Sequence, residues 1–308
     1  MKLLPAAALG LLAAFILPAP ARAAERELWS RANLFAWCIV PFDFRKRDSE
    51  QRAQMLDGLG LRAIAYDFRA EHVPTFDTEV ETMRRHGIDF FAWWFPTTLN
   101  DEARGILAVC RRHRIAPQLW VMGGGAPVKS PEEQAARIEQ ETARLLPIAR
   151  AAAEIGSQVA LYNHGAWFGE PENQLAIIAR LARDGVQNVG MVFNFHHAHE
   201  YLPRFAELWP KMQPRVLAVN LNGMEISGDA KGRKILHLGE GDRELEMMRI
   251  IEASGWRGPV GIIDHRPETD SEETLRNNLR GLEWLKSELA KPGSGGGKPF
   301  AAPAAEAR

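Results

Sequence analysis

Short apolar segments alternate with amphipathic segments along most of the chain. The apolar segments end in turn-forming or polar residues, as expected for buried strands, and cover residues 34–40, 61–66, 88–94, 116–121, 158–162, 188–193, 216–221 and 260–263. The intervening segments repeat apolar positions every three to four residues, which is typical of helices that bury one face. The predicted helices cover residues 46–59, 76–86, 101–112, 131–155, 171–183, 201–211, 242–253 and 271–289.

This alternation predicts a single (β/α)8 TIM barrel, a parallel eight-stranded barrel with outer helices, over residues 24–290. A strand followed by a crossover helix returns parallel to its neighbour, so the repeat implies a parallel sheet. Eight such units in about 260 residues match the usual size of this barrel. An open doubly wound sheet is the alternative. The number of units and the lack of a glycine-rich turn after residues 34–40 argue against it.

The two ends of the sequence differ from the barrel in composition. Lys2 precedes an apolar run over residues 3–17 and small residues over 18–23, so we expect residues 1–23 to be a secretory signal peptide. The run is short of the roughly 20 residues that span a membrane, which favours cleavage over a retained anchor. The signal predicts a periplasmic or secreted protein. Residues 291–308 are rich in Gly, Pro and Ala, and we expect a disordered tail.

Charge and cysteine content exclude several classes of protein. The formal net charge is −1, and no basic stripe is present, so no nucleic-acid partner is expected. After the signal, no stretch of the sequence is long and apolar enough to predict a membrane span, and no membrane partner is expected. The two cysteines, Cys38 and Cys110, make no disulfide framework, and we expect two buried free thiols.

Polar and aromatic residues gather at the predicted carboxyl ends of the strands, where TIM barrels carry their active sites. The first four strand ends supply Trp37, Cys38, Tyr66, Asp67, Arg69, Trp93, Trp94 and Trp120. The last four supply Asn163, His164, Asn194, His196, His197, His199, Asn220, Asn222, Asp264, His265 and Arg266. Tryptophan packs against sugar rings, and the polar side chains can bond hydroxyl groups. The set therefore predicts a small-molecule carbohydrate as the partner.

Three of these residues are the candidates for catalysis: His164, His197 and Asp264. Imidazole titrates near neutral pH, which suits acid–base work. If strand geometry persists, His196 and His197 point to opposite sides, and we expect His197 to face the barrel axis. Asp264 ends a buried strand, where an unpaired carboxylate is costly, so we expect it to have a partner.

The other candidates are expected to bind substrate, and they are Trp37, Trp94, Trp120, Asn163, Asn194, His196, His199, Asn220, Asn222, His265 and Arg266. Each has a structural alternative, because tryptophan packs in cores, asparagine forms turns and His199 can cap a helix. The stretch 223–241 is long for a strand-to-helix connection. It is expected to be either a lid that brings His237 or Glu240 to the site or a mobile surface loop.

Three motifs give the chain a resemblance to a known family. They are Asn163-His164-Gly165, Asn220-Leu221-Asn222-Gly223 and Leu238-Gly239-Glu240-Gly241. They resemble the xylose-isomerase-like TIM barrel superfamily, which includes sugar and sugar-phosphate isomerases and epimerases, inosose dehydratases and endonuclease IV. The resemblance covers most of residues 31–289. It implies a divalent metal, often Mn²⁺ or Mg²⁺, held by side chains of the late strands.

The sequence departs from that family at the positions that the resemblance assigns to the metal. Tyr162 stands where Glu is usual, Asn194 where Asp is usual and Asn220 where His is usual, whereas His197 is kept and Asp264 matches the final Glu. Neutral amides bind hard divalent cations weakly. The remaining metal expectation is a softer site, suited also to Zn²⁺, made of His164, His197 and Asp264.

These patterns predict an exported sugar isomerase or epimerase, or a keto-sugar lyase, that acts by proton transfer beside a carbonyl. His197 or His164 is expected to be the base, Asp264 to orient a ligand and Arg266 to stabilise an enediolate oxygen. The loss of charged family ligands leaves a non-catalytic carbohydrate-binding barrel as the alternative. DNA repair, as in endonuclease IV, fits poorly because the chain is slightly acidic and has no basic groove.

Overall fold

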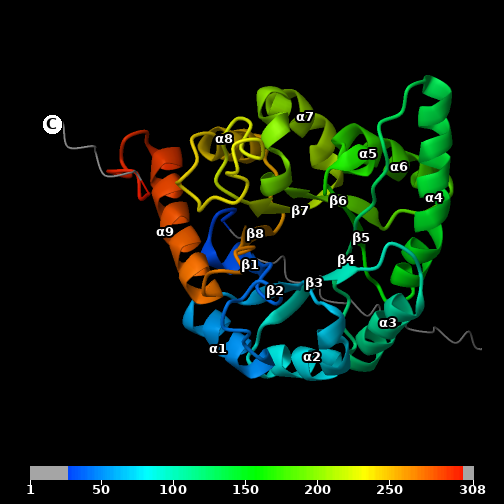
Figure 1. Cartoon of the computed structure of the whole chain (residues 1–308), viewed down its shortest axis with the longest axis horizontal. Helices are drawn as coiled ribbons and strands as arrows, with labels where there is room; N and C mark the ends of the chain where they lie inside the picture. The colour runs from blue at the N-terminus through cyan, green and yellow to red at the C-terminus, as the bar shows by residue number, and fades with distance from the viewer. Residues whose placement is uncertain (1–26, 301–308) are drawn as a thin grey trace, which may run out of the picture.

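The computed structural model describes residues 27–300, so the predicted signal peptide over 1–23 and residues 301–308 lie outside the described residues. Eight parallel strands close into one barrel in chain order (Figure 1). They are β1 Leu34–Trp37, β2 Ala63–Tyr66, β3 Asp89–Phe95, β4 Gln118–Val121, β5 Val159–Tyr162, β6 Val189–Asn194, β7 Val216–Leu221 and β8 Val260–Ile263. The single parallel TIM barrel predicted from the sequence is confirmed.

Helices surround the strands on the outside of the barrel (Figure 1). The α-helices are α1 Ser49–Gly58, α2 Phe76–Arg85, α3 Asp101–His113, α4 Pro131–Ala153, α5 Ala166–Gly169, α6 Pro171–Arg183, α7 Phe205–Met212, α8 Glu244–Ala253 and α9 Ser271–Ala290. The short α5 was not predicted, and the predicted helix 201–211 begins as the 3₁₀ helix η4 His199–Arg204, which contains Pro203. Across the described part of the chain, no helix has the length and apolarity to cross a membrane.

Polar caps fix several helix starts. Asp48 accepts a hydrogen bond from the Gln51 backbone N–H, and the Gln51 side chain accepts one from the Asp48 N–H, which completes a capping box. At α3, α4 and α9, a side-chain oxygen of Asn100, Ser130 or Asp270 accepts a backbone N–H of the first turn. Because such caps contribute typically ~1 kcal/mol each, local sequence determines where these helices begin.

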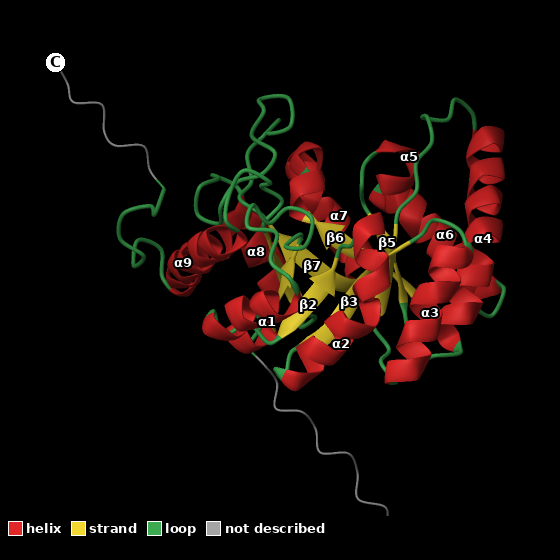
Figure 2. Cartoon of the chain, turned by 60° about the horizontal axis from the view of Figure 1, so that its bottom comes forward, coloured by secondary structure: helices red, strands yellow, loops and turns green. Residues whose placement is uncertain are grey.

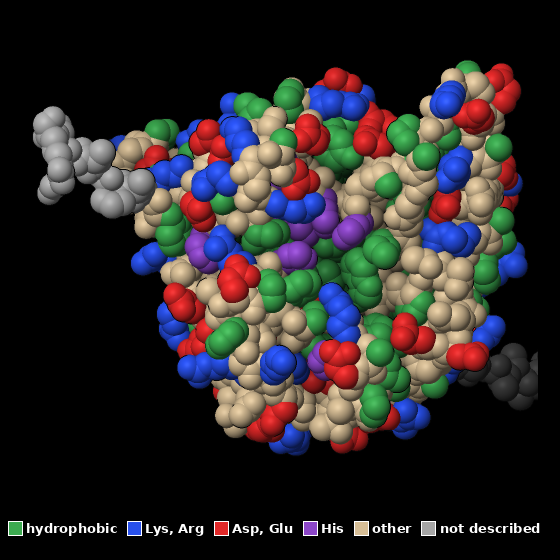
Figure 3. Space-filling model, in the orientation of Figure 1, with side chains coloured by type: hydrophobic (Ala, Val, Ile, Leu, Met, Phe, Trp, Pro, Cys, Tyr) green, Lys and Arg blue, Asp and Glu red, His purple; other side chains and the backbone are tan. Residues whose placement is uncertain are grey.

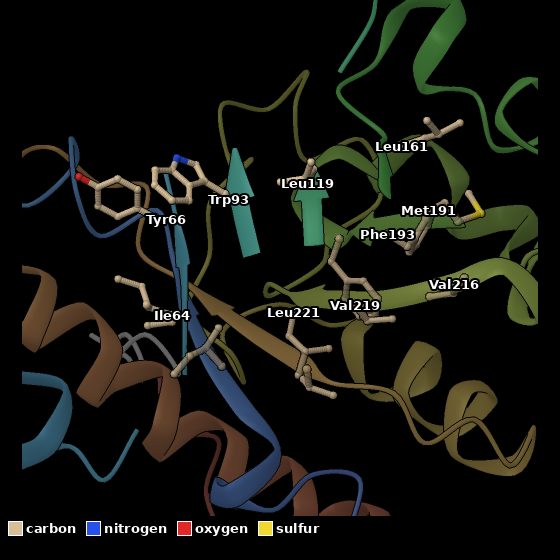
Figure 4. Close-up of a cluster of buried hydrophobic side chains, with 14 of the residues drawn as sticks. Ile64, Tyr66, Trp93, Leu119, Leu161, Met191, Phe193, Val216, Val219 and Leu221 are labelled. Carbon is tan, nitrogen blue, oxygen red and sulfur yellow. The ribbon is translucent and has the colours of Figure 1, made fainter. Parts of the chain in front are cut away.

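The barrel wall is apolar on both sides. Side chains on the outer side, among them Ile64, Trp93, Phe193 and Leu221, belong to the larger core that packs between the strands and the helices (Figure 4). A second, smaller cluster fills the barrel interior. Its large members are Phe35, Trp37, Trp120 and Tyr162, and its small members include Ala65, Ala92, Ala160 and Ala218. The alanines leave the room that the rings occupy, so an aromatic plug closes the barrel centre.

The loops that follow the strands gather at one end of the barrel (Figure 2). The loop of residues 222–243, between β7 and α8, is a large part of this end. Beside it lies the segment 291–300, which composition alone predicts to be disordered.

That segment instead packs against the barrel. The Glu288 carboxylate accepts the backbone N–H groups of Gly293 at 2.8 Å and Gly295 at 2.7 Å. The Phe300 ring lies 5.1 Å from the His237 ring and 4.7 Å from the Arg280 guanidinium carbon. One carboxylate and one aromatic ring thus give residues 291–300 specific partners, which composition alone does not reveal.

Candidate active site

A cavity of about 80 Å³ opens beside the aromatic plug, at the carboxyl ends of the strands. Its lining residues come from β1, β2, β3, β5, β6 and β8 or from the segments that follow them. They are Trp37, Cys38, Phe42, Asp67, Arg69, Trp94, Tyr162, His164, His196, His197 and His265. From this side, histidines gather in a hollow near the centre of the molecule (Figure 3). TIM barrels carry their active sites at this end.

Three aromatic side chains form one wall of the cavity. The Tyr162 ring lies 4.8 Å from that of Trp94, edge to face, and 6.0 Å from that of Trp37. The Trp37 indole N–H donates to the Tyr162 hydroxyl over 3.3 Å. Trp37 and Trp94 thus line the cavity, and their role in substrate binding stays a prediction. Trp120 does not line the cavity, because it is fully buried in the plug and its indole N–H donates to Gln118 over 3.0 Å.

Four histidines line the cavity at different depths. His164 is exposed, His197 and His265 are half-buried, and His196 is buried. Ring centroids are 4.4 Å apart for His164 and His197, and 4.0 Å apart for His197 and His196. His196 Nε2 lies 3.5 Å from the Tyr162 hydroxyl. His164, His197 and His196 form a row from the mouth to the aromatic wall. His265 instead stacks on Phe42 with a centroid distance of 4.1 Å.

Both members of the His196–His197 pair reach the cavity, although strand geometry predicts that only His197 faces the axis. Strand β6 ends at Asn194, and the next three residues form the 3₁₀ helix η3 Phe195–His197. A 3₁₀ helix turns successive side chains by about 120°, whereas a strand turns them by about 180°. The two imidazoles therefore lie side by side, and the expectation about their directions is wrong.

Burial keeps these imidazoles neutral at physiological pH. It lowers the pKa of His197 to about 2 and the pKa of His196 well below its ordinary value, and the neighbouring imidazoles and Lys234 also disfavour protonation of both rings. Burial also lowers the pKa of His164 and of His265, with a contribution from Lys234. His197 is consequently a very weak base. His164 is exposed to solvent, so it is the better base of the row.

Asp67 supplies a carboxyl group that the sequence-based choice of catalytic residues left out. It directly follows β2 and is 3% exposed. One oxygen accepts the Val40 backbone N–H over 3.3 Å, and the other has no hydrogen-bond partner among the described residues. Burial raises the Asp67 pKa to about 8, against the opposing charge of Arg69. The carboxyl group is therefore mostly protonated at neutral pH and can donate a proton to a ligand.

Two strand ends beside the cavity hold non-glycine residues in the left-handed region. Cys38 follows β1 with φ 57°, and His265 follows β8 with φ 54°. Such conformations cost roughly 1–2 kcal/mol each, and they occur often at functional sites. They bring the thiol and the imidazole to the cavity wall. Burial, followed by the charge of Asp67, raises the pKa of the Cys38 thiol well above its usual range, so this thiol is neutral.

Asp264 faces away from the cavity, toward α9. Its carboxylate accepts the Ser271 hydroxyl over 2.5 Å, and burial raises its pKa to about 7. The structure therefore divides the predicted catalytic trio, because His164 and His197 line the cavity and Asp264 does not. The partner expected for this buried carboxylate is a serine of the protein. The adjacent His265 lines the cavity, and its binding of substrate stays a prediction.

Asn163, Asn194 and Asn220 bind one another, and none lines the cavity. The Asn163 side-chain oxygen accepts the Asn194 backbone N–H and the Asn194 side-chain amide, both over 2.8 Å. The Asn163 amide donates to the Asn194 carbonyl over 3.1 Å, and the Asn220 amide donates to the Asn194 side-chain oxygen. All three are 0% exposed. This amide ladder joins the ends of β5, β6 and β7, so the predicted contacts with sugar hydroxyls are replaced by contacts within the protein.

Asn222, His199 and Arg266 hold the loop of residues 222–243. The Asn222 amide donates to the Lys234 carbonyl over 2.8 Å, and the His199 ring nitrogens lie 2.8 and 2.9 Å from the carbonyls of Glu225 and Lys234. The Arg266 guanidinium donates to the Ile235 carbonyl over 2.9 Å. These three residues, which were predicted to contact the substrate, thus bind the backbone of the loop. His237 and Glu240, which a lid was expected to bring to the site, are not among the cavity-lining residues.

The divalent metal implied by the family resemblance does not fit the donors at the corresponding positions. Burial raises the pKa of the Tyr162 phenol, Asn194 and Asn220 are engaged in the amide ladder, and Asp264 faces α9. Within residues 27–300, no three His, Cys, Asp or Glu side chains are arranged to hold a metal ion. The expected site of His164, His197 and Asp264 is therefore not formed.

Comparisons with known proteins agree with the fold. A family model described as "Xylose isomerase-like TIM barrel" matches residues 41–288. No curated protein sequence matches the chain significantly. One similar solved structure is the apo form of 3-keto-D-glucoside 4-epimerase from E. coli, with 13% identity and a TM-score of 0.59, over 83% of this chain and 99% of that chain.

Two further solved structures are similar at comparably low identity. L-ribulose 3-epimerase has 15% identity and a TM-score of 0.58, over 84% of this chain and 97% of that chain. The IOLI protein with a bound zinc atom has 14% identity and a TM-score of 0.62, over 83% and 98%. These likenesses establish the fold. The family model spans most of the sequence, which confirms the resemblance inferred from the three motifs: the chain belongs to the xylose isomerase-like TIM barrel family.

Proposed function

We propose that this protein isomerises or epimerises a small carbohydrate by moving a proton at a carbon beside a carbonyl group. The observation that carries the proposal is one cavity that combines a mostly protonated carboxyl group, four neutral imidazoles and an aromatic wall. Similar folds in proteins named 3-keto-D-glucoside 4-epimerase and L-ribulose 3-epimerase support a sugar as the substrate.

Proton transfer of this kind needs an acid and a base whose pKa values lie near the working pH. Asp67, with a pKa of about 8, donates its proton to the carbonyl oxygen of the substrate. His164 accepts the proton from the neighbouring carbon, and an enediol forms. The His164 proton is then delivered to the former carbonyl carbon, and Asp67 recovers a proton from the hydroxyl of the neighbouring carbon, which becomes the new carbonyl. Both residues finish in their starting protonation states, so the cycle is balanced.

The other lining residues position the sugar. The half-buried Trp94 offers a flat apolar surface to the C–H side of a sugar ring, and the buried Trp37 and Tyr162 pack behind it at the cavity wall. His196 and His197 are neutral, so each imidazole can donate one hydrogen bond and accept another. That combination suits hydroxyl groups, which also both donate and accept.

We also infer that the protein is exported to the periplasm or secreted. The apolar run over residues 3–17 and the small residues over 18–23 support this inference. Amino-terminal sequencing of the protein from the producing cell tests it. A mature chain that starts at Ala24 is expected, and a chain that retains Met1 in the cytoplasm would contradict export.

Carbohydrate binding without turnover is the second candidate function. It is favoured by the neutral residues Tyr162, Asn194 and Asn220 at positions where the family resemblance places charged ligands. A panel of ketoses and aldoses, incubated with the protein and followed by ¹³C NMR, separates the two candidates. Interconversion that is lost in Asp67→Asn supports the enzyme, whereas saturable binding without any product supports the binding protein. Full turnover in both Asp67→Asn and His164→Ala would make the assigned roles wrong.

A further inference from the structure

Arg69 is a cation at the cavity that has no counter-ion within the described residues. It follows Asp67 on the segment after β2, lines the cavity and is exposed. Its guanidinium makes one hydrogen bond, to the Phe68 carbonyl over 2.7 Å, and none of the described carboxylates lies within ion-pair distance. A guanidinium presents five N–H donors, so most of them are available to a ligand.

Contacts with an aromatic ring hold Arg69 at this place. Its guanidinium carbon lies 5.4 Å from the centroid of Phe42, and the same Phe42 ring stacks on His265 at 4.1 Å. Arg69, Phe42 and His265 are therefore linked through one ring at the edge of the cavity. Cation–π contact of this kind orients a guanidinium without neutralising its charge.

Other arginines around the same end of the barrel are paired. Arg47 lies 2.8 Å from Asp43, Arg45 lies 2.8 Å from Asp270, and Arg233 lies 2.6 Å from Glu225. Arg266 lies 3.7 Å from Glu240 and also donates to a backbone carbonyl. Unpaired charge is thus a specific property of Arg69 among these residues.

The other groups of the cavity do not neutralise this charge. Asp67 is the only carboxylic acid among the lining residues, and burial keeps it mostly protonated at neutral pH. The four imidazoles are neutral, and Lys234, which also lowers their pKa values, is itself paired with Asp229 at 3.1 Å. Lys and Arg side chains lie on two sides of the central histidine patch (Figure 3). The lining of the cavity therefore carries a net positive charge, which attracts anions.

We propose that the substrate carries an anionic oxygen group, a carboxylate or a phosphate, which Arg69 binds at the mouth of the cavity. The planar guanidinium matches two oxygens of such a group, and neutral imidazole N–H groups at the mouth can donate to the remaining oxygens. The inference deepens the proposed function, on which it rests for the sugar part of the substrate. Arg69, Asp67 and His164 line the same cavity, so one sugar can place its anionic group at Arg69 and its carbonyl group at the proposed acid and base.

Calorimetric titration of the whole protein with three probes tests this proposal. The probes are D-glucose, D-glucuronate and D-glucose 6-phosphate, which share a ring and differ in charge. The proteins are the wild type, Arg69→Gln, and Arg45→Gln as the matched control. Arg45→Gln removes the same charge from the same end of the barrel. Arg45, however, pairs with Asp270 and does not line the cavity.

We expect at least one anionic probe to bind the wild type roughly 10- to 100-fold more tightly than glucose. That preference should vanish in Arg69→Gln and persist in Arg45→Gln, and the preferred probe shows whether the group is a carboxylate or a phosphate. Equal binding of all probes, no binding of either anion, or a preference that survives Arg69→Gln would overturn the proposal. Tight anion binding without turnover would contradict only the proposed catalysis, whereas turnover of neutral sugars alone would contradict only this inference.

Discussion

The imidazole rings of His164 and His197 lie with their centroids 4.4 Å apart, at the ends of the neighbouring strands β5 and β6. His196 continues the row 4.0 Å beyond His197, toward the Tyr162 hydroxyl. Only the first of these rings is exposed, so solvent reaches the row at His164. This arrangement makes His164 the member that can exchange a proton with water between turnovers, while the deeper rings orient the ligand.

Replacement of Asp67 by Asn should abolish most of the activity. The amide keeps the shape of the side chain but has no acidic proton, so we expect kcat/KM to fall about 10²- to 10⁴-fold. In the wild type, activity should fall as the pH rises through about 8, where Asp67 loses the proton that it donates. Rate measurements from pH 5 to 10 check both points. Asp264→Asn is the matched control, because Asp264 does not line the cavity, and an alkaline limb that disappears in this control would contradict the assignment.

His164→Asn and His197→Asn should have different effects on rate and binding. We expect His164→Asn to lower kcat about 100-fold, because it removes the base. His197→Asn should mainly raise KM, because burial already makes His197 a poor base and its loss removes a hydrogen bond to substrate. Steady-state kinetics on the same substrate separate the two effects. A larger loss of kcat in His197→Asn than in His164→Asn would reverse the roles.

The raised pKa of Asp67 should also appear in the stability of the fold. The folded-state pKa of about 8 exceeds the ordinary value of 3.8, so the folded protein binds more protons than the unfolded chain between these pH values. This contribution is fully present below pH 3.8 and is lost as the pH rises toward 8. Asp67→Asn should therefore become more stable relative to the wild type from pH 4 to pH 8, by up to ~1.4 kcal/mol per pH unit. Urea unfolding at several pH values measures this difference, and a constant difference would contradict the raised pKa.

Breaking the amide ladder should destabilise the barrel. Asn194→Ala removes the side-chain partner of Asn220 in a fully buried place, while Asn163 keeps its bonds to the Asn194 backbone, so we expect a loss of about 1–3 kcal/mol for the unsatisfied Asn220 amide. Gln187→Ala removes an exposed amide whose one hydrogen bond is 3.5 Å long, and it should change stability by less than about 0.5 kcal/mol. Chemical denaturation of both variants gives the comparison. Equal small effects would show that the ladder contributes little.

Chelation should change neither the melting temperature nor the activity. The donors at the family's metal positions are engaged elsewhere, because Asn194 and Asn220 bond each other and Asp264 bonds Ser271. Elemental analysis of the mature protein, with assays before and after dialysis against EDTA, makes the test. Stoichiometric Mn²⁺, Mg²⁺ or Zn²⁺ with activity that is lost on chelation and restored by the same ion would contradict this reading.

The fold could be predicted from the sequence because eight buried strands and eight helices leave few alternatives. The directions of side chains at the strand ends could not. A parallel strand buried on both sides shows no alternation of polar and apolar residues, so the sequence of β8 does not reveal whether Asp264 or His265 faces the cavity. The structure settles this point, because Asp264 accepts from Ser271 while His265 lines the cavity.

Partners within the protein were equally hidden in the sequence. From the sequence, Asn163, Asn194 and Asn220 are each predicted to bond a substrate hydroxyl. Only the packing of neighbouring strands shows that they form hydrogen bonds with one another. Arg266 and Arg69 are both arginines after strand ends, but only Arg69 reaches the cavity, because Arg266 binds a loop carbonyl whose position depends on the tertiary fold. Asp67 was visible at a strand end, and its burial, which gives it an unusual pKa, was not.

Exchange of carbon-bound hydrogen with solvent tests the central claim most directly. Candidate keto-sugars, neutral and anionic, are incubated with the protein in D₂O and followed by ¹H NMR at the carbon beside the carbonyl. We predict that deuterium enters this position in the wild type and that Asp67→Asn and His164→Asn slow the exchange about 100-fold or more. A wild-type protein that binds these sugars but incorporates no deuterium into any of them would contradict proton-transfer catalysis and leave a carbohydrate-binding barrel.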